Sequence, residues 1–273
     1  GAAERGRRGG RVVSRLRAAF DAARADGRAA FVPYLTAGFP DRVGFQHAAE
    51  TLLRYADVLE VGLPYSDPLG DGPTIQRSSE RALAQGTRTR DVFEMIARLR
   101  ADHATPIALM TYYNPIYCYP DGGPEGFVRD LVAAGADGAI LPDLPPDEAD
   151  ELLPIARAHG LDTVFLAAPT STDERIARVA AASRGFVYAV SVTGVTGARA
   201  SLPDDVPALV DRIRAAGELP VAVGFGVAGG ETAARVAAAA DGVVVGSALI
   251  RTLDEGGDLE ALASEIARAC VRR

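Results

Sequence analysis

Eight short apolar runs alternate with helix-length amphipathic segments along the chain, and this alternation limits the fold more than any other feature. The runs are rich in Val, Leu, Ala and Phe without polar alternation, as expected for parallel strands covered on both faces. They are Phe31–Thr36, Val58–Gly62, Pro106–Tyr112, Gly138–Leu141, Asp162–Ala167, Phe186–Ser191, Val221–Gly224 and Gly242–Gly246. Eight strand–helix units in a chain of 273 residues predict a single (β/α)8 barrel.

The segments between the runs predict the outer helices. Helical stretches include Val43–Tyr55, Arg90–Ala101, Asp147–His159, Thr172–Ala182, Pro207–Ala215, Glu231–Ala238 and Leu259–Cys270. Val12–Ala25 predicts an extra N-terminal helix before the first strand. Residues 1–10 are rich in Arg and Gly and are expected to form a flexible tail, which leaves 11–273 as one barrel domain. A doubly wound sheet would need a Gly-rich fingerprint after its first strand, and Thr36–Pro40 is not one.

The composition excludes several classes of function. A net charge of −7 and a pI near 5.1 argue against nucleic-acid binding, which needs a basic surface. No apolar run approaches the ~18 residues that a membrane span requires. No secretory signal opens the chain and there is no disulfide framework, so we expect a cytoplasmic protein.

The basic residues and histidines narrow the possible chemistry. All 29 basic residues are Arg, which rules out a Schiff base on Lys. His47, His103 and His159 do not have metal-ligand spacing and are expected at the surface or at helix ends, so we predict no metal site. The remaining groups are carboxylates, hydroxyls and backbone dipoles. In a barrel they would act at the carboxyl ends of the strands.

A carboxyl group interrupts the second apolar run. Glu60 lies within Val58–Gly62, where an ionised side chain is costly unless it is paired or functional. Strand alternation places Glu60 and Gly62 on one side, and we expect the small Gly62 to leave room for a ligand. Burial would raise the pKa of Glu60 and suit it to give and take protons near neutrality. The alternative is a buried Glu60 that is hydrogen-bonded in the barrel core.

A second carboxyl group follows in the loop after this run. Asp71 lies eleven residues beyond Glu60 in a Pro- and Gly-rich loop, before a helix expected to start near Pro73-Thr74. The pair suggests one carboxyl on a rigid strand and one on a loop that closes over the substrate. Spacing does not exclude Asp67, in the same loop, as the partner instead.

Glycines after the last strands indicate a phosphate site. Gly226 follows the seventh run, and Gly246 and Ser247 follow the eighth, where a short helix starting at Ser247 would direct its positive end at an anion. Phosphate at these two loops recurs in this fold. Gly194–Gly197 adds a third Gly-rich loop, and Arg199 is a candidate additional contact. The alternative is that these glycines only form tight turns.

Apolar side chains at the strand ends would line a cavity of aromatic size. Each residue is most simply part of the core, but together they could hold a flat ring. The set comprises Phe31, Tyr34, Met110, Tyr112, Ile140, Tyr188 and Phe225.

Phe31–Gly38 and Leu59–Thr74 together resemble tryptophan synthase α subunits closely. The match continues in order through Asn114-Pro115, Leu141–Pro145, Gly194–Gly197, Gly224–Gly226 and Gly246-Ser247. The resemblance implies a lyase that cleaves indole-3-glycerol phosphate by a retro-aldol reaction into indole and glyceraldehyde 3-phosphate. It implies no cofactor in this chain and a pyridoxal-phosphate β subunit as partner, in an α2β2 heterotetramer.

The resemblance also implies roles for individual residues. Glu60 matches the principal acid–base group, Asp71 the carboxylate that stabilises charge at the indole N–H, and Tyr188 a tyrosine that positions Glu60 and substrate. The residues that match the phosphate cradle are Gly197, Gly226, Gly246 and Ser247. The residues that match indole contacts are Tyr34, Met110 and Phe225. Those that match the coupling of loop closure to the site are Thr196 and Asp143.

Two departures from the family pattern keep an alternative open. Gly70 stands where Ala is commoner, and Cys118–Pro124 is an unusually Pro/Gly-rich connection near the expected β-subunit contact. A stand-alone lyase that releases free indole would tolerate both. Asn114 and Pro145 match partner-facing positions and favour the complex. Two further readings are a different sugar-phosphate isomerase or aldolase, and a degenerate subunit that only activates its partner.

Overall fold

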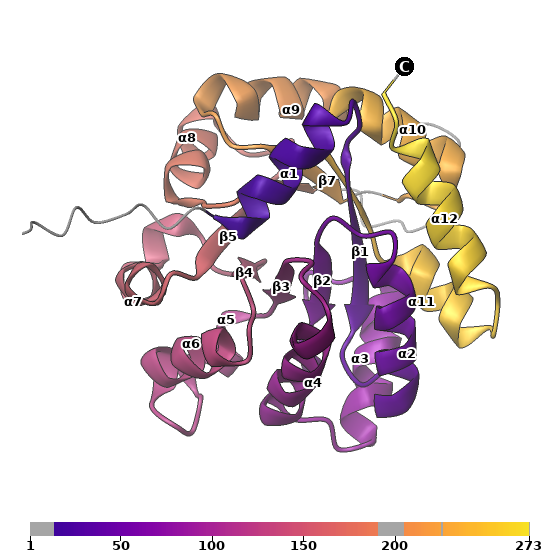
Figure 1. Ribbon diagram of the computed structural model, residues 1–273. Helices are drawn as coiled ribbons and strands as arrows, with labels where there is room; N and C mark the ends of the chain where they lie inside the picture. Colours follow the sequence, from indigo (N-terminus) through magenta and orange to yellow (C-terminus); the bar gives the residue numbers. More distant parts are fainter. Residues whose placement is uncertain (1–13, 191–204, 225, 273) are drawn as a thin grey trace, which may run out of the picture.

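Eight parallel strands close into a barrel surrounded by helices, as the apolar runs predict (Figure 1). The computed structural model describes residues 14–190, 205–224 and 226–272. The strands pair in chain order, and β1 closes the barrel against β8. They are β1 Ala30–Thr36, β2 Leu59–Gly62, β3 Ile107–Met110, β4 Gly138–Leu141, β5 Asp162–Ala167, β6 Val187–Val190, β7 Val221–Gly224 and β8 Gly242–Val245.

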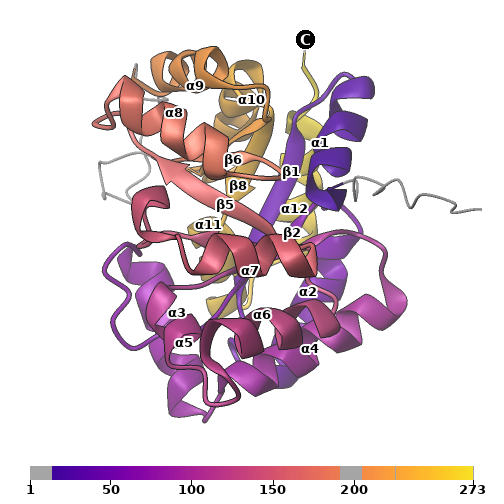
Figure 2. The same ribbon diagram turned by 90° about the vertical axis from the view of Figure 1, so that its left-hand side faces the viewer.

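The helices form the outer layer of the barrel, and Figure 2 shows the same layer after a turn of the view. They are α1 Arg15–Ala25, α2 Arg42–Leu53, α3 Pro73–Ala84, α4 Thr89–Asp102, α5 Tyr113–Tyr117, α6 Gly123–Ala133, α7 Leu152–His159, α8 Asp173–Ala182, α9 Asp205–Ala216, α10 Gly230–Ala239, α11 Ser247–Asp254 and α12 Leu259–Ala269. A 3-10 turn, η1, spans Pro146–Glu148. No helix in the described part of the chain is long and apolar enough to cross a membrane.

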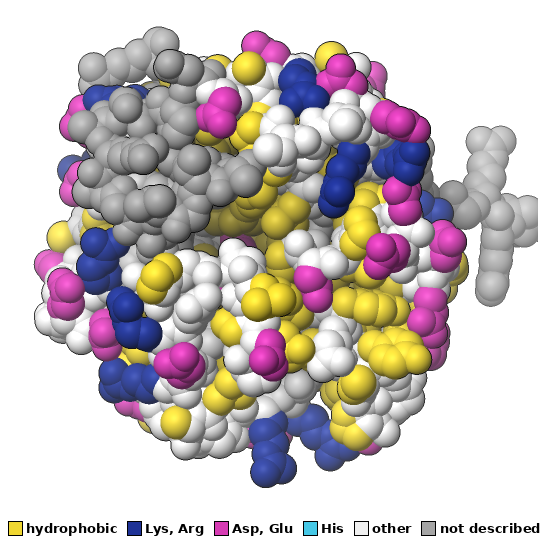
Figure 3. All heavy atoms as spheres, turned by 180° about the vertical axis from the view of Figure 1, so that it is seen from behind, with side chains coloured by type: hydrophobic (Ala, Val, Ile, Leu, Met, Phe, Trp, Pro, Cys, Tyr) yellow, Lys and Arg dark blue, Asp and Glu magenta, His cyan; other side chains and the backbone are white. Residues whose placement is uncertain are grey.

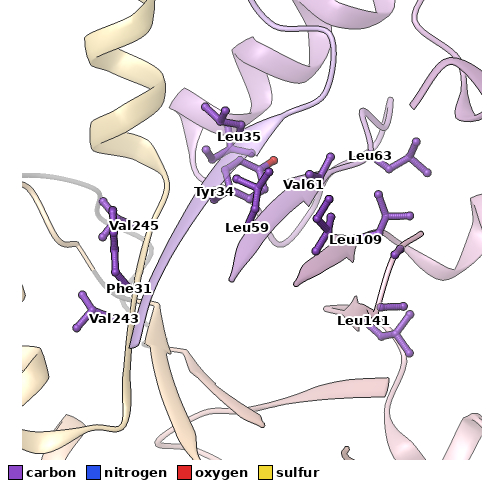
Figure 4. Packing of buried hydrophobic residues seen from close by; sticks show 14 of the residues in the cluster. Phe31, Tyr34, Leu35, Leu59, Val61, Leu63, Leu109, Leu141, Val243 and Val245 are labelled. Atoms are coloured by element: carbon purple, nitrogen blue, oxygen red, sulfur yellow. The ribbon is translucent and has the colours of Figure 1, made fainter. Parts of the chain in front are cut away.

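Strand alternation separates two hydrophobic cores. Leu59 and Val61 of β2 belong to the outer core between the strands and the helices, where Figure 4 shows them near Leu109. Val58 and Ile140 belong to the smaller core inside the barrel. Glu60 lies between Leu59 and Val61 in the strand, so its side chain points into the barrel.

Helix α1 packs against the amino end of the barrel and confirms the predicted extra N-terminal helix. Phe20 stacks on Phe186 with ring centroids 5.0 Å apart, and Gly242 has no side chain to obstruct its ring. Ser14 caps α1 and donates a hydrogen bond to the buried Asp162 carboxylate. This end of the barrel is therefore closed by packed apolar groups. The predicted tail over residues 1–10 lies outside the described residues.

The helices after β3 and β4 differ from the sequence expectation. Helix α6 begins at the end of the Pro/Gly-rich connection Cys118–Pro124, because Pro124 lies in its first turn, where no backbone donor is needed. The helix expected over Asp147–His159 begins only at Leu152, after the separate turn η1. Asp147 instead accepts a hydrogen bond from Arg178 of the next helix at 2.6 Å.

Candidate active site

A pocket opens at the carboxyl end of the barrel and combines residues from six strands and the loops that follow them. The face in Figure 3 is hollowed near its centre, with hydrophobic side chains in the hollow and charged ones around it. Eight of the residues proposed from the sequence line this pocket: Tyr34, Glu60, Asp71, Met110, Tyr188, Gly226, Gly246 and Ser247. Residues more than a hundred positions apart therefore contribute to one site.

Glu60 is the most deeply buried charged group of the pocket. Its side chain is fully buried, and neither carboxyl oxygen has a hydrogen-bond partner among the described residues. Burial, with a smaller contribution from the charge of Asp71, raises the pKa of Glu60 to about 8. The predicted orientation of Glu60 into the barrel mouth is confirmed, and the alternative of a hydrogen-bonded core residue has no support among these contacts. A neutral Glu60 at neutral pH can donate a proton.

Two tyrosines, the buried Tyr34 and the half-buried Tyr188, occupy the space beside Glu60. Tyr34 pairs with Glu60 in the β1–β2 register, and a Cβ at Gly62 would lie 2.1 Å from the Tyr34 hydroxyl oxygen. The expectation that Gly62 leaves room for a ligand was therefore wrong, because the Tyr34 ring fills that space. Gly224 makes room for Tyr188 in the same way, at 2.4 Å from its hydroxyl oxygen. The two glycines let the rings reach across the barrel to the pocket.

A buried hydroxyl chain holds the Tyr34 side chain in place. The Tyr34 and Thr36 hydroxyl oxygens lie 3.2 Å apart, and that of Thr36 lies 2.6 Å from that of Ser78. The Ser78 hydroxyl in turn donates to the carbonyl of Ile75, 2.7 Å away. The chain links β1 to helix α3, which follows the loop that carries Asp71.

Asp71 faces the pocket from the loop between β2 and α3. Burial raises its pKa to about 6, and a hydrogen bond from Tyr112 opposes that rise. The backbone N–H of Gly70 donates to the Tyr112 hydroxyl at 3.0 Å, and Gln76 donates to the Asp71 carbonyl at 2.9 Å. Asp67, the other candidate, is exposed and does not line the pocket. Geometry therefore selects Asp71.

The other end of the pocket is built from the ends of β7 and β8. Gly226 has a φ of 39°, in the left-handed region that favours glycine. Gly246 is the N-cap of α11, which starts at Ser247, so the N–H groups of its first turn are available to an anion. The remaining phosphate and indole candidates, Gly197 and Phe225, lie outside the described residues.

Of the two residues expected to couple loop closure to the site, Asp143 belongs to the described part of the chain, and it does not line the pocket. Asp143 follows β4 and borders a separate groove with Leu166 and Ser171. Its carboxylate accepts a hydrogen bond from the Tyr113 N–H at 2.9 Å, which holds the start of α5. Thr196 lies outside the described residues.

Two residues of this region were not assigned a role from the sequence. Tyr112 was interpreted as one of the apolar strand-end residues, yet its hydroxyl contacts both Gly70 and Asp71. Arg251 lines the pocket beside Ala248. Arg199, the cation suggested by the sequence, lies outside the described residues. A signal for Arg251 was present, because it stands one helical turn after Ser247.

The fold and the pocket define a class of enzyme. Near neutral pH the pocket combines a protonated carboxyl, an ionised carboxylate and an apolar wall with a helix N-terminus at its far end. Among the described residues no group of three His, Cys, Asp or Glu is arranged to hold a metal. The site is thus that of a (β/α)8-barrel enzyme that can move protons with carboxyl groups.

Comparisons with known proteins identify the family. The family model described as "Tryptophan synthase alpha chain" matches residues 20–272. The chain is 55% identical over 263 residues to the tryptophan synthase alpha chain of Deinococcus radiodurans, covering 96% of each, and 47% identical to that of Mycobacterium ulcerans, covering 96% of this chain and 97% of the relative. A structure of Mycobacterium tuberculosis tryptophan synthase matches with a TM-score of 0.89 and 46% identity, over 95% of this chain and 99% of that one. The chain therefore belongs to the tryptophan synthase alpha chain family, and it is a carbon–carbon lyase of the α reaction.

Proposed function

We propose that Glu60 and Asp71 carry out the retro-aldol cleavage of indole-3-glycerol phosphate to indole and glyceraldehyde 3-phosphate. The observation that carries this proposal is the unpaired, fully buried Glu60 carboxyl in a pocket that Asp71 also lines. A buried carboxyl without partners destabilises the fold, so its place at the barrel mouth favours a chemical role. The apolar wall with Tyr34 and Met110 suits the indole ring.

The reaction requires two proton transfers at one group. Protonated Glu60 donates its proton to indole C3, which leaves a positive charge on the ring nitrogen. The resulting Glu60 carboxylate then takes the proton of the hydroxyl on the adjacent side-chain carbon. The bond from that carbon to C3 breaks, the carbonyl of glyceraldehyde 3-phosphate forms, and the bond electrons return to the ring. Glu60 ends protonated, as it began, so one residue completes the cycle.

Asp71 has a different task from Glu60. Its lower pKa keeps it ionised at pH 7 while Glu60 is protonated. An ionised Asp71 accepts a hydrogen bond from the indole N–H and stabilises the positive charge that protonation of C3 creates. Tyr188, which lines the pocket with Glu60, positions that carboxyl and the substrate. Because the pKa of Glu60 is higher than that of Asp71, Glu60 acts as the acid and Asp71 as the stabilising carboxylate.

The phosphate of the substrate binds at the end of the pocket formed by Gly226, Gly246 and Ser247, where it meets the N-terminus of α11. Gly197 joins this cradle, Phe225 joins the indole contacts, and Thr196 and Asp143 couple loop closure to the site. The chain needs no cofactor of its own.

The chain works with a pyridoxal-phosphate β subunit in an α2β2 complex in the cytoplasm and passes indole to it. Leu69, in the loop after β2, is 94% exposed, and Tyr117, in α5 after β3, is 61% exposed. The two strands are neighbours, so both side chains belong to the carboxyl face of the barrel. Large apolar side chains exposed on one face support a protein partner there.

The test follows indole release from indole-3-glycerol phosphate, with the protein alone and with saturating β subunit. We expect slow cleavage alone and faster cleavage in the complex, because the partner fixes the loop that carries Asp71. No indole under either condition would contradict the proposed reaction. Equal rates in both would contradict coupling to a partner and favour a stand-alone lyase.

A further inference from the structure

Among the described residues, those that line the pocket around Glu60 carry little positive charge. The described residues that line it include two carboxyl groups, Glu60 and Asp71, and one basic side chain, that of Arg251. A phosphate monoester adds about two negative charges near neutral pH. Backbone N–H groups and a helix end supply only partial charges against it. A full positive charge at the edge of the pocket is therefore in a position to contribute to binding.

Arg251 lies one turn beyond the start of α11. Because α11 begins at Ser247, four residues earlier, the two side chains project from the same face of the helix. Helical side chains lean toward the N-terminus, which directs the Arg251 guanidinium back toward the first turn. Arg251 accordingly lines the pocket together with Gly246, Ser247 and Ala248.

Arg251 also borders a second groove, between α3 and α11, where another arginine is already paired. In that groove Arg81 lies 3.1 Å from Asp254 and 5.3 Å from the centre of the Phe39 ring. Arg251 is exposed and, within the described part of the chain, has no carboxylate within 4.0 Å. Its guanidinium thus remains available to an anion that enters the active-site pocket.

We propose that Arg251 is a phosphate-binding residue of this enzyme, donating hydrogen bonds from its guanidinium to the substrate phosphate. The planar donor fork of arginine suits phosphate oxygens, and the contact is charge-assisted. The proposal rests on the proposed function, because the phosphorylated substrate is what provides the anion. The competing role is purely structural: Arg251 stands in the last turn of α11, where a cation stabilises the helix dipole.

Phosphate binding by Arg251 and stabilisation of the end of α11 have different effects on substrate affinity and on the chemical step. The phosphate takes no part in bond breaking at indole C3, so loss of its contact weakens binding and leaves the chemical step nearly unchanged. Loss of a helix-end charge would instead lower the melting temperature and leave phosphate affinity unchanged. Arg77 is a matched control, because it is an exposed arginine that lines the neighbouring groove and not the active-site pocket.

The experiment measures binding of glycerol 3-phosphate by calorimetry for wild type, Arg251→Gln, Arg251→Lys and Arg77→Gln. We expect Arg251→Gln to raise Kd roughly 10-fold, as loss of one charge-assisted contact does, and Arg251→Lys to raise it less. Arg77→Gln should stay within about twofold of wild type, since it lies outside the pocket. With indole-3-glycerol phosphate, Arg251→Gln should raise KM by a similar factor with kcat within about twofold.

An unchanged Kd in Arg251→Gln would overturn the assignment, and so would an equal loss of affinity in Arg77→Gln. A lower melting temperature with unchanged Kd would leave only the helix-end role and would also overturn it. Failure of the proposed function looks different, because wild type would then neither bind glycerol 3-phosphate nor release indole.

Discussion

At the amino end of the barrel, the carboxylate of Asp241 is surrounded by donors. It accepts hydrogen bonds from the Val221 N–H at 3.0 Å and from Arg214 and Arg272 at 3.2 Å each. Burial by itself would raise the pKa of Asp241, but the Val221 N–H and the two guanidiniums hold it below its usual value. Asp241 is thus an ionised group that stabilises the fold.

At the carboxyl end, the surroundings of Glu60 have the opposite effect on its pKa. It is more deeply buried than Asp241, but its carboxyl has no donor among the described residues and lies against the negative charge of Asp71. The pKa of Glu60 therefore rises where that of Asp241 falls. On the proposed function, the barrel uses buried carboxyl groups for stability at its amino end and for proton transfer at its carboxyl end.

The pairing at the amino end is repeated around the barrel. Asp57 accepts from the Phe31 N–H and from Arg28 at 2.8 Å each. Asp137 accepts from the Ile107 N–H at 2.9 Å and from Arg100 at 2.7 Å. Like Asp241, both Asp57 and Asp137 precede an even-numbered strand. Their carboxylates accept a backbone hydrogen bond from the odd-numbered strand before it. Stability at this end is therefore distributed over several similar contacts.

The largest expected effect is on activity. Glu60→Gln should lower kcat about 10²–10⁴-fold or more, because it removes a group that acts in two proton transfers and keeps its shape. The melting temperature should not fall, since no hydrogen bond of Glu60 to a described residue is lost. The measurement is single-turnover indole release, with Asp67→Asn as the exposed control. Retention of a large part of the activity would contradict the role of Glu60.

The next effect is on stability, at the other end of the barrel. Asp241→Asn should lower the free energy of unfolding by about 2–3 kcal/mol, because three donors lose a buried charge. Activity per folded molecule should stay close to wild type, since Asp241 does not line the pocket. Urea unfolding at pH 7 measures the loss. Asp211→Asn, at an exposed site in α9, is the control. An equal loss of stability in that variant would contradict the stabilising role of Asp241.

The smallest effect is on the pH dependence. The profile of kcat/KM should have an acid limb near pH 6, where Asp71 loses its charge, and an alkaline limb near pH 8, where Glu60 loses its proton. Tyr112→Phe removes a hydrogen bond that lowers the pKa of Asp71, so the acid limb should move to higher pH. At pH 7 the loss should be about twofold to fivefold. Tyr65→Phe, which keeps its ring stacked on Tyr112, should leave the limb in place.

The sequence predicted the barrel well, because its fold depends on a repeated local pattern. Parallel strands covered on both faces are apolar without interruption, and every predicted run overlaps one of the observed strands. Glu60 was identified for the same reason, since a charge inside such a run is conspicuous. The start of a helix is set by weaker signals, so α7 was predicted to start too early.

Features that depend on contacts between distant residues were harder to predict. The role of Tyr112 comes from a hydrogen bond to Gly70, 42 residues away, and nothing in the apolar strand end indicates it. Gly62 was expected to make room for a ligand, but only the register of β1 against β2 places the Tyr34 ring there. That Asp71 rather than Asp67 enters the pocket likewise follows from the path of the loop.

The most direct test of the central claim is the protonation state of Glu60 itself. Infrared difference spectra of wild type minus Glu60→Gln isolate the carboxyl C=O band of Glu60 and can be followed as a function of pH. We expect the band to persist at pH 7 and to disappear with a midpoint near pH 8. A midpoint near the ordinary value of 4.5 would mean that Glu60 is ionised at neutral pH, and it would contradict the claim that an unpaired buried carboxyl supplies the proton.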